Sequence, residues 1–114
     1  LCLMSLFGCK AADFRSVDAD TFAHVIEDTT VIRLDVRTAN EYAQGHIPNA
    51  LLIDVTQADF MQKAEQLLPK DKTIALYCRS GRRSKNAAMQ LAQHGYQVVE
   101  LNTGFNSWKG EIER

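Results

Sequence analysis

Residues 73–84 read TIALYCRSGRRS, an apolar run followed by a basic loop that contains one glycine. The run at 73–77 is typical of a strand that is buried on both faces in the middle of a parallel sheet. Cys78 follows directly, and Gly81 allows the positive φ that a tight turn into a helix requires. Ser84 is expected to be the N-cap of that helix. The unit therefore predicts that Cys78 lies at the carboxyl edge of a sheet, where ligands bind in open α/β folds.

The sequence on both sides of this unit alternates between short apolar runs and helical periodicity. Further strands are predicted at residues 14–17, 31–36, 50–53 and 98–101. Helices are predicted after an N-cap at Asp18, at 39–44, at 58–68 and from Ser84 to Gly95, with a terminal turn or helix at 104–109. Strands that alternate with helices over short connections predict an α/β fold. We expect a central parallel sheet of about five strands with helices on both faces.

The composition limits the chain to one domain and excludes several classes of partner. The hydrophobic fraction of 46% is enough for one core, and a length of 114 residues is too short for two domains. The net charge of -1 gives no chain-wide basic field for nucleic acid. Three cysteines, an odd number, cannot form a disulfide framework, and their spacing does not match a zinc site. We expect residues 13–114 to form the domain.

Residues 1–12 differ from the rest of the chain because they begin with an almost wholly apolar segment. Leu6-Phe7-Gly8-Cys9 resembles the cleavage box of a bacterial lipoprotein signal, although Phe7 stands where a small residue is usual. Under this interpretation residues 1–12 are the remnant of a signal and a linker, and Cys9 is the site of lipidation. The protein would then be lipid-anchored in the bacterial cell envelope. The alternative is an apolar segment that packs on the domain or on a partner, with a cytoplasmic location.

The surroundings of Cys78 favour a reactive thiolate. Backbone N–H groups of the loop and the positive end of the following helix dipole both stabilise a negative sulfur. The seven residues that begin at Arg79 contain no acid and four of the thirteen basic residues, which are Arg79, Arg82, Arg83 and Lys85. The alternative is a small buried core cysteine beside a solvated helix start. The concentration of cations at one thiol favours an anionic nucleophile that meets an anionic substrate.

Three motifs resemble the signatures of rhodanese domains in the order and spacing of that family. They are Asp35-Val-Arg37 with Glu41-Tyr42 and Gly45-His-Ile-Pro48, the loop Cys78-Arg-Ser-Gly-Arg-Arg-Ser84, and Gly104-Phe-Asn-Ser-Trp108. The resemblance covers the chain from about Asp13 onward and implies a three-layer α/β sulfurtransferase. It departs at Asn49, where the family usually has glycine, although asparagine tolerates the left-handed conformation.

The resemblance also implies a mechanism and a set of site residues. Cys78 would take a sulfane sulfur from a small anionic donor such as thiosulfate and pass it, as a persulfide, to cyanide or a thiol. The substrate-binding residues would be Arg79, Ser80, Gly81, Arg82, Arg83 and Ser84. Asp35 and Arg37 would support the same edge of the sheet. Independently of the resemblance, the Gly-His-Ile-Pro setting of His46 is a loop that leads into a strand, which favours a structural role over that of a general base for Cys78. The implied chemistry needs no cofactor and no metal.

Two alternatives remain open at the level of sequence. The domain could be a sulfur-relay or binding module that carries the persulfide to a protein partner. A phosphatase or arsenate reductase would use a similar loop, but those enzymes need an Arg six positions after the cysteine, and Ser84 stands there. The residues specify neither the physiological donor and acceptor nor the oligomeric state.

Overall fold

The computed structural model describes residues 13–114 and contains a five-stranded sheet in which every strand pair is parallel. The strand order is β1-β5-β4-β2-β3. The strands are β1 (Arg15–Val17), β2 (Ile32–Asp35), β3 (Leu51–Leu52), β4 (Ile74–Tyr77) and β5 (Val98–Leu101). The predicted parallel α/β sheet is therefore confirmed, and β4 lies at its centre as the apolar run indicated.

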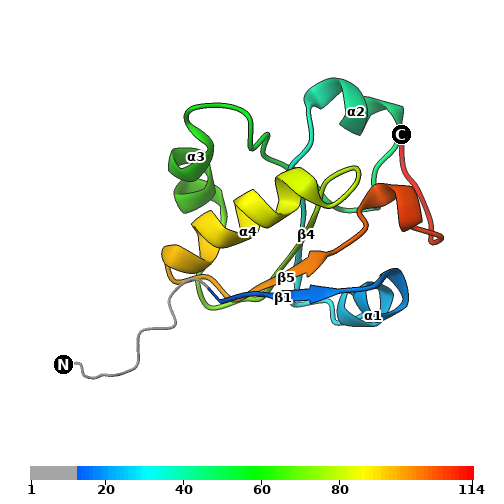
Figure 1. Cartoon of the computed structure of the whole chain (residues 1–114), viewed down its shortest axis with the longest axis horizontal. Helices are drawn as coiled ribbons and strands as arrows, with labels where there is room; N and C mark the ends of the chain where they lie inside the picture. Colours follow the sequence, from blue (N-terminus) through cyan, green and yellow to red (C-terminus); the bar gives the residue numbers. More distant parts are fainter. Residues whose placement is uncertain (1–12) are drawn as a thin grey trace.

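Helices cover both faces of the sheet, as the alternating pattern predicted. They are α1 (Ala19–Val25), α2 (Ala39–Gln44), α3 (Phe60–Leu67), α4 (Arg82–Gln93) and a short 3-10 helix, η1 (Phe105–Ser107). Asp18 caps α1 by accepting a hydrogen bond from the N–H of Thr21 at 2.9 Å. Figure 1 shows α3 and α4 on one side of the sheet and α1 on the other. The three layers match the predicted architecture.

Two hydrophobic clusters fill the space between these layers. Because side chains alternate along a strand, Ile74, Leu76 and Cys78 face the cluster that contains α3 and α4. Ala75 and Tyr77 face the other cluster, which contains α1 and η1. All four residues of β4 are buried, which explains its continuous apolar sequence.

The start of α4 differs from the sequence prediction. Gly81, with φ of 101°, is the N-cap, and the helix begins at Arg82. Ser84 is thus the third residue of the helix rather than its cap, and it is fully buried. The left-handed conformation of Gly81 turns the chain into the helix three residues earlier than the serine pattern indicated. This correction places the Ser84 side chain inside the fold.

Several other expectations concern Asn49 and the two ends of the chain. Asn49 adopts φ of 66°, the left-handed conformation for which asparagine is suited. The segment predicted as a terminal turn or helix is η1, after which Trp108 packs edge-on against Phe22. The signal and Cys9 lipidation predictions fall on residues 1–12, outside the described residues. Within residues 13–114, no helix has the length and apolar character needed to cross a membrane.

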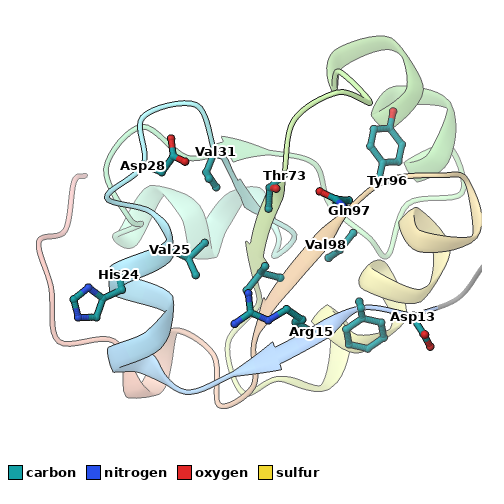
Figure 2. A pocket seen from close by; sticks show the side chains of 12 residues that line it. Asp13, Arg15, His24, Val25, Asp28, Val31, Thr73, Tyr96, Gln97 and Val98 are labelled. Atoms are coloured by element: carbon teal, nitrogen blue, oxygen red, sulfur yellow. The ribbon is translucent and has the colours of Figure 1, made fainter.

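A cavity of about 740 Å³ opens at the amino edge of the sheet. Thr73 and Gln97 immediately precede β4 and β5 and line this cavity together with Arg15 of β1 (Figure 2). In a parallel sheet the carboxyl ends of the strands lie at the opposite edge. Cys78 follows the carboxyl end of β4, so it lies at the opposite end of the strands from this cavity.

Candidate active site

Cys78 lies where β4 ends, at the carboxyl edge of the sheet, and the loop after it leads into α4. Its exposed fraction is 0%, and the N–H of Gly81 donates a hydrogen bond to Sγ at 3.1 Å. The carbonyl of Cys78 accepts from the N–H of Phe105 at 2.8 Å, and that of Arg79 accepts from Asn106 at 3.0 Å. The loop is thus held between the first turn of α4 and the C-terminal η1.

Two glycines make this loop possible: Gly81 within the loop and Gly104 in the segment that packs against it. Gly81 has φ of 101°, and a Cβ there would collide with the carbonyl oxygen of Asn102. Gly104 has φ of 68°, and a Cβ there would collide with the carbonyl group of Arg79. The chain after β5 therefore packs directly against the loop backbone, an approach that only glycine permits at both points.

The loop favours the thiolate form of Cys78. Burial of the sulfur raises its pKa, but hydrogen bonds from the hydroxyl and N–H of Ser84 and from the N–H groups of Gly81 and Ser80 act the other way. These donors outweigh burial, so the pKa of Cys78 is lower than that of an ordinary thiol. Of the loop amides at 79–84 that were expected to surround the sulfur, those of Ser80, Gly81 and Ser84 face it.

The basic residues of the loop are less available than the sequence indicated, because acids from other elements reach them. Arg83 donates to both carboxylate oxygens of Glu41, at 2.8 and 3.0 Å, and Arg79 lies 3.5 Å from the same carboxylate. The Arg83 guanidinium lowers the pKa of Glu41 to about 2. Lys85 lies 3.3 Å from the carboxylate of Glu100. Arg82 is exposed, and no ion pair described for residues 13–114 involves it.

Asp35 and Arg37 form a buried ion pair at the end of β2. The Nε and Nη2 atoms of Arg37 donate to the Asp35 carboxylate at 2.7 to 3.1 Å. Nη2 also donates to the carbonyl of Gly45 at 2.7 Å, and the guanidinium lies 4.4 Å from the ring centre of Phe105. These contacts join β2 to the end of α2 and to η1. Their geometry agrees with a supporting role at this edge of the sheet.

His46 occupies a structural position of the kind its sequence context favoured. Its Nδ1 lies 2.9 Å from the carbonyl of Tyr42, and its ring stacks on the Tyr42 ring with centres 3.7 Å apart. Its backbone forms a β-bridge with Glu113. Among the described residues, no group of three or more His, Cys, Asp or Glu side chains is arranged to hold a metal ion.

The fold and the loop geometry agree with a comparison to protein-family models. Residues 18–111 match the model of the rhodanese-like domain. The chain belongs to the rhodanese-like domain family. Relatives of the chain include proteins named as sulfurtransferases, which supports a sulfurtransferase family.

Two curated relatives and two solved structures illustrate the relationship. A sulfurtransferase of Allochromatium vinosum is 36% identical over 94 residues, which cover 81% of this chain and 85% of that protein. The thiosulfate sulfurtransferase GlpE of Coxiella burnetii is 29% identical over 75% of this chain and 78% of its own. A rhodanese-like domain protein of Staphylococcus aureus (29% identity, TM-score 0.76) covers 88% of this chain and 97% of its own. A rhodanese-related protein of Thermoplasma volcanium (28%, TM-score 0.73) covers 88% and 98%.

Sequence reasoning missed two acids of this rhodanese-like domain. Glu41 belongs to the quoted motif but received no role, although a loop with three arginines and no acid needs a counter-ion from elsewhere. Glu100 is an acid within the otherwise apolar strand VVEL, which is an unusual position for a charge. Each acid contacts a basic residue of the loop or of the first turn of α4, so both belong to the site as the fold assembles it.

Proposed function

We propose that this rhodanese-like domain transfers a sulfane sulfur from a small anionic donor to a thiophilic acceptor through a persulfide on Cys78. The observation that carries the proposal is the position of the Cys78 sulfur at the start of α4, where the N–H of Gly81 donates to it at 3.1 Å and hydrogen bonds from the loop lower the pKa of Cys78. A thiolate is the nucleophile that attack on a sulfur donor requires.

The first half-reaction, with thiosulfate as donor, forms one sulfur–sulfur bond and breaks another. The Cys78 thiolate attacks the outer sulfur of thiosulfate, and sulfite leaves with the electron pair of the broken bond. The persulfide that remains carries its negative charge on the outer sulfur, where the loop amides can stabilise it. In the second half, cyanide or a thiolate attacks that outer sulfur, and the Cys78 thiolate is regenerated.

The arginines are proposed to attract and orient the anionic donor. Arg82 is exposed at the start of α4 and free of described ion pairs, so it is the first cation that a donor would meet. Arg83 becomes available when an anion replaces the Glu41 carboxylate. Because Sγ is fully buried, the donor reaches it only when the side chains around the loop shift. We propose that the donor anion replaces the Glu41 carboxylate as the partner of Arg83 when it approaches Sγ.

The length of the loop supports this function over phosphoryl or arsenate chemistry. Ser84 occupies the sixth position after Cys78, and its hydroxyl points to the buried Glu100, 2.5 Å away. No guanidinium is therefore supplied there to bind a tetrahedral oxyanion. A relay module that delivers its sulfur to a protein partner uses the same persulfide. An enzyme that acts on small molecules should turn over rapidly with cyanide, whereas a relay module should do so slowly.

The test is to incubate the full chain with thiosulfate and to measure its mass. We expect one added sulfur atom, mapped to the peptide of Cys78 and removed by cyanide. A Cys78→Ser variant should gain none at that peptide, whereas Cys2 and Cys9 remain as internal controls. A native chain that gains no sulfur would contradict the proposal. Loading with slow cyanide turnover, and fast transfer to a protein thiol, would favour the relay.

A further inference from the structure

Lys85, in the first turn of α4, places its ammonium among three oxygen atoms of the fold. Its Nζ donates to the carbonyl oxygen of Gly81 at 3.1 Å, to that of Asn102 at 3.2 Å and to Oε2 of Glu100 at 3.3 Å. An ammonium has three N–H donors, so these oxygens use its full hydrogen-bonding capacity. In the sequence Lys85 counts among the cations near Cys78, but these contacts direct its N–H groups toward the protein.

Gly81 links Lys85 to the sulfur of the active site. Its N–H donates a hydrogen bond to Sγ of Cys78 at 3.1 Å, and its carbonyl accepts one from Lys85. Gly81 has φ of 101° and ψ of -2°, and glycine has access to a wider range of backbone conformations than other residues. The direction of the Gly81 N–H therefore depends on contacts that hold this residue from outside.

The other two oxygens connect Lys85 to the sheet. Asn102 directly follows β5, which pairs with β1 on one side and with β4 on the other. Glu100 lies within β5, has an exposed fraction of 0% and accepts hydrogen bonds from the hydroxyls of Ser16 and Ser84 at 2.6 and 2.5 Å. Both acceptors are thus held by the sheet and not by the loop.

We propose that Lys85 is a positioning residue that ties Gly81 to the end of β5 and so keeps the N–H of Gly81 directed at the sulfur of Cys78. Gly81 approaches Asn102 so closely that a Cβ on Gly81 would collide with the Asn102 carbonyl oxygen. One ammonium donates to the carbonyl oxygens of both residues and joins the two backbones at this point. The inference rests on the proposed function, because a fixed N–H stabilises the thiolate that attacks the sulfur donor.

The competing role for Lys85 is attraction of the anionic sulfur donor, because its side chain is 49% exposed. The two roles differ in what they require of the side chain. Attraction of an anion requires only a positive charge, whereas positioning requires three N–H donors at one point. Arginine keeps the charge, but its planar guanidinium does not present its donors as a compact ammonium does. The Lys85→Arg variant therefore separates the two roles.

The experiment titrates the Cys78 thiolate in the reduced full chain without any sulfur donor. Thiolate absorbance is followed with pH in the native chain, in Lys85→Met and in Lys85→Arg, and the spectrum of the matching Cys78→Ser chain is subtracted from each. A less well directed N–H should raise the midpoint for Cys78 by about half to one pH unit in both variants. Lys63→Met is the matched control, because Lys63 is 53% exposed and pairs with Asp59 away from the loop. It should leave the midpoint unchanged.

Two results of this titration would overturn the inference. One is an unchanged midpoint in Lys85→Met. The other is a native midpoint in Lys85→Arg, because a positive charge would then be sufficient. Lys85→Arg keeps a cation beside the buried Glu100, so the test does not depend on whether Lys85→Met folds.

A second measurement follows the Gly81 amide itself. In a chain labelled with ¹⁵N-glycine, the Gly81 amide proton should move downfield as Cys78 ionises, because a hydrogen bond to a charged acceptor is stronger than one to a neutral acceptor. We expect the amplitude of this movement in Lys85→Arg to fall below about half of its native value, since the N–H is no longer held toward Sγ. A native amplitude in Lys85→Arg would contradict the positioning role.

These outcomes are separate from failure of the proposed function. A raised midpoint and a reduced Gly81 amplitude in the variants, in a protein whose native chain gains no sulfur from thiosulfate, would support the positioning role and contradict sulfur transfer. Sulfur loading of the native chain, together with native titration of Lys85→Arg, would contradict the positioning role alone. Both titrations use protein without a sulfur donor, so neither requires activity.

Discussion

Replacing Glu41 by Gln removes the carboxylate that Arg83 and Arg79 share while keeping the size of the side chain. Glu41 is 19% exposed, and its carboxylate also takes part in the capping box of α2 with Thr38. Contacts other than those with the arginines therefore help to hold the carboxylate in place. Its pKa is lowered to about 2 from an ordinary value of 4.5, mainly by the hydrogen bond from Arg83. The difference between these two pKa values measures how strongly the folded site stabilises the ionised form of Glu41.

A shift of this size corresponds to about 3 kcal/mol. Arg79 is more than half exposed and solvent screens part of the interaction, so we expect Glu41→Gln to destabilise the native state by about 1–2 kcal/mol at pH 7. Because the folded pKa is depressed, this stabilisation is complete above the unfolded pKa of 4.5 and is lost as pH falls toward 2. More than half of the difference between native and variant should be lost at pH 3.

The assay is urea unfolding of the native chain and the variant at pH 7, 5 and 3, with the free energy of unfolding extrapolated to water. Glu65→Gln is the matched control, because it removes the carboxylate of an exposed pair with Lys70, which should cost less than about 0.5 kcal/mol. A double-mutant cycle with Arg83→Gln isolates the pair. Equal stability of Glu41→Gln and the native chain at pH 7, or a difference that does not shrink at pH 3, would refute the reasoning.

Four further outcomes are expected. Asp35→Asn breaks a buried ion pair and should destabilise the protein by about 3–5 kcal/mol in urea unfolding; a cost below about 1 kcal/mol would contradict the supporting role. Gly81→Ala meets both a positive φ and a backbone collision, so it should cost at least about 2 kcal/mol and abolish sulfur loading; a stable, active variant would be evidence against the loop geometry. Arg82→Gln should raise KM for thiosulfate about fivefold (~1 kcal/mol) without changing Tm, and steady-state kinetics with an unchanged KM would assign donor binding to other residues. Thiolate absorbance of Cys78 should reach its midpoint at lower pH in the folded chain than in the urea-unfolded chain, because the fold lowers its pKa; coincident midpoints would argue against thiolate stabilisation.

The sheet was predictable because its signals are local. The apolar run of β4, the Asp18 cap and the alternation of short elements each depend on neighbouring residues, and all appear in the structure. The start of α4 was misplaced because a serine is a common N-cap, whereas the turn depends on the φ of Gly81. A side chain at that position would collide with the backbone at Asn102, which is distant in sequence.

The site was predictable only as far as its loop. Cys78 and the following amides lie in one continuous segment, so their convergence could be inferred from residue types and a glycine. The partners of the loop cations could not, because Glu41 and Glu100 come from α2 and β5, on either side of the loop in sequence. The sequence therefore overestimated the positive charge that an incoming anion would meet. Only the folded chain shows which cations are already paired.

The tether between the loop and η1 has a consequence for the newly made chain. The carbonyls of Cys78 and Arg79 are held by N–H groups of Phe105 and Asn106, near the C-terminus. Until this last segment has docked, the loop lacks these two hydrogen bonds, and we expect the pKa of Cys78 to lie closer to that of an ordinary thiol. Under the proposed function, loading of Cys78 with sulfur would then be a late event that follows completed folding. Chains that lack this last segment would then be expected to gain no sulfur from thiosulfate.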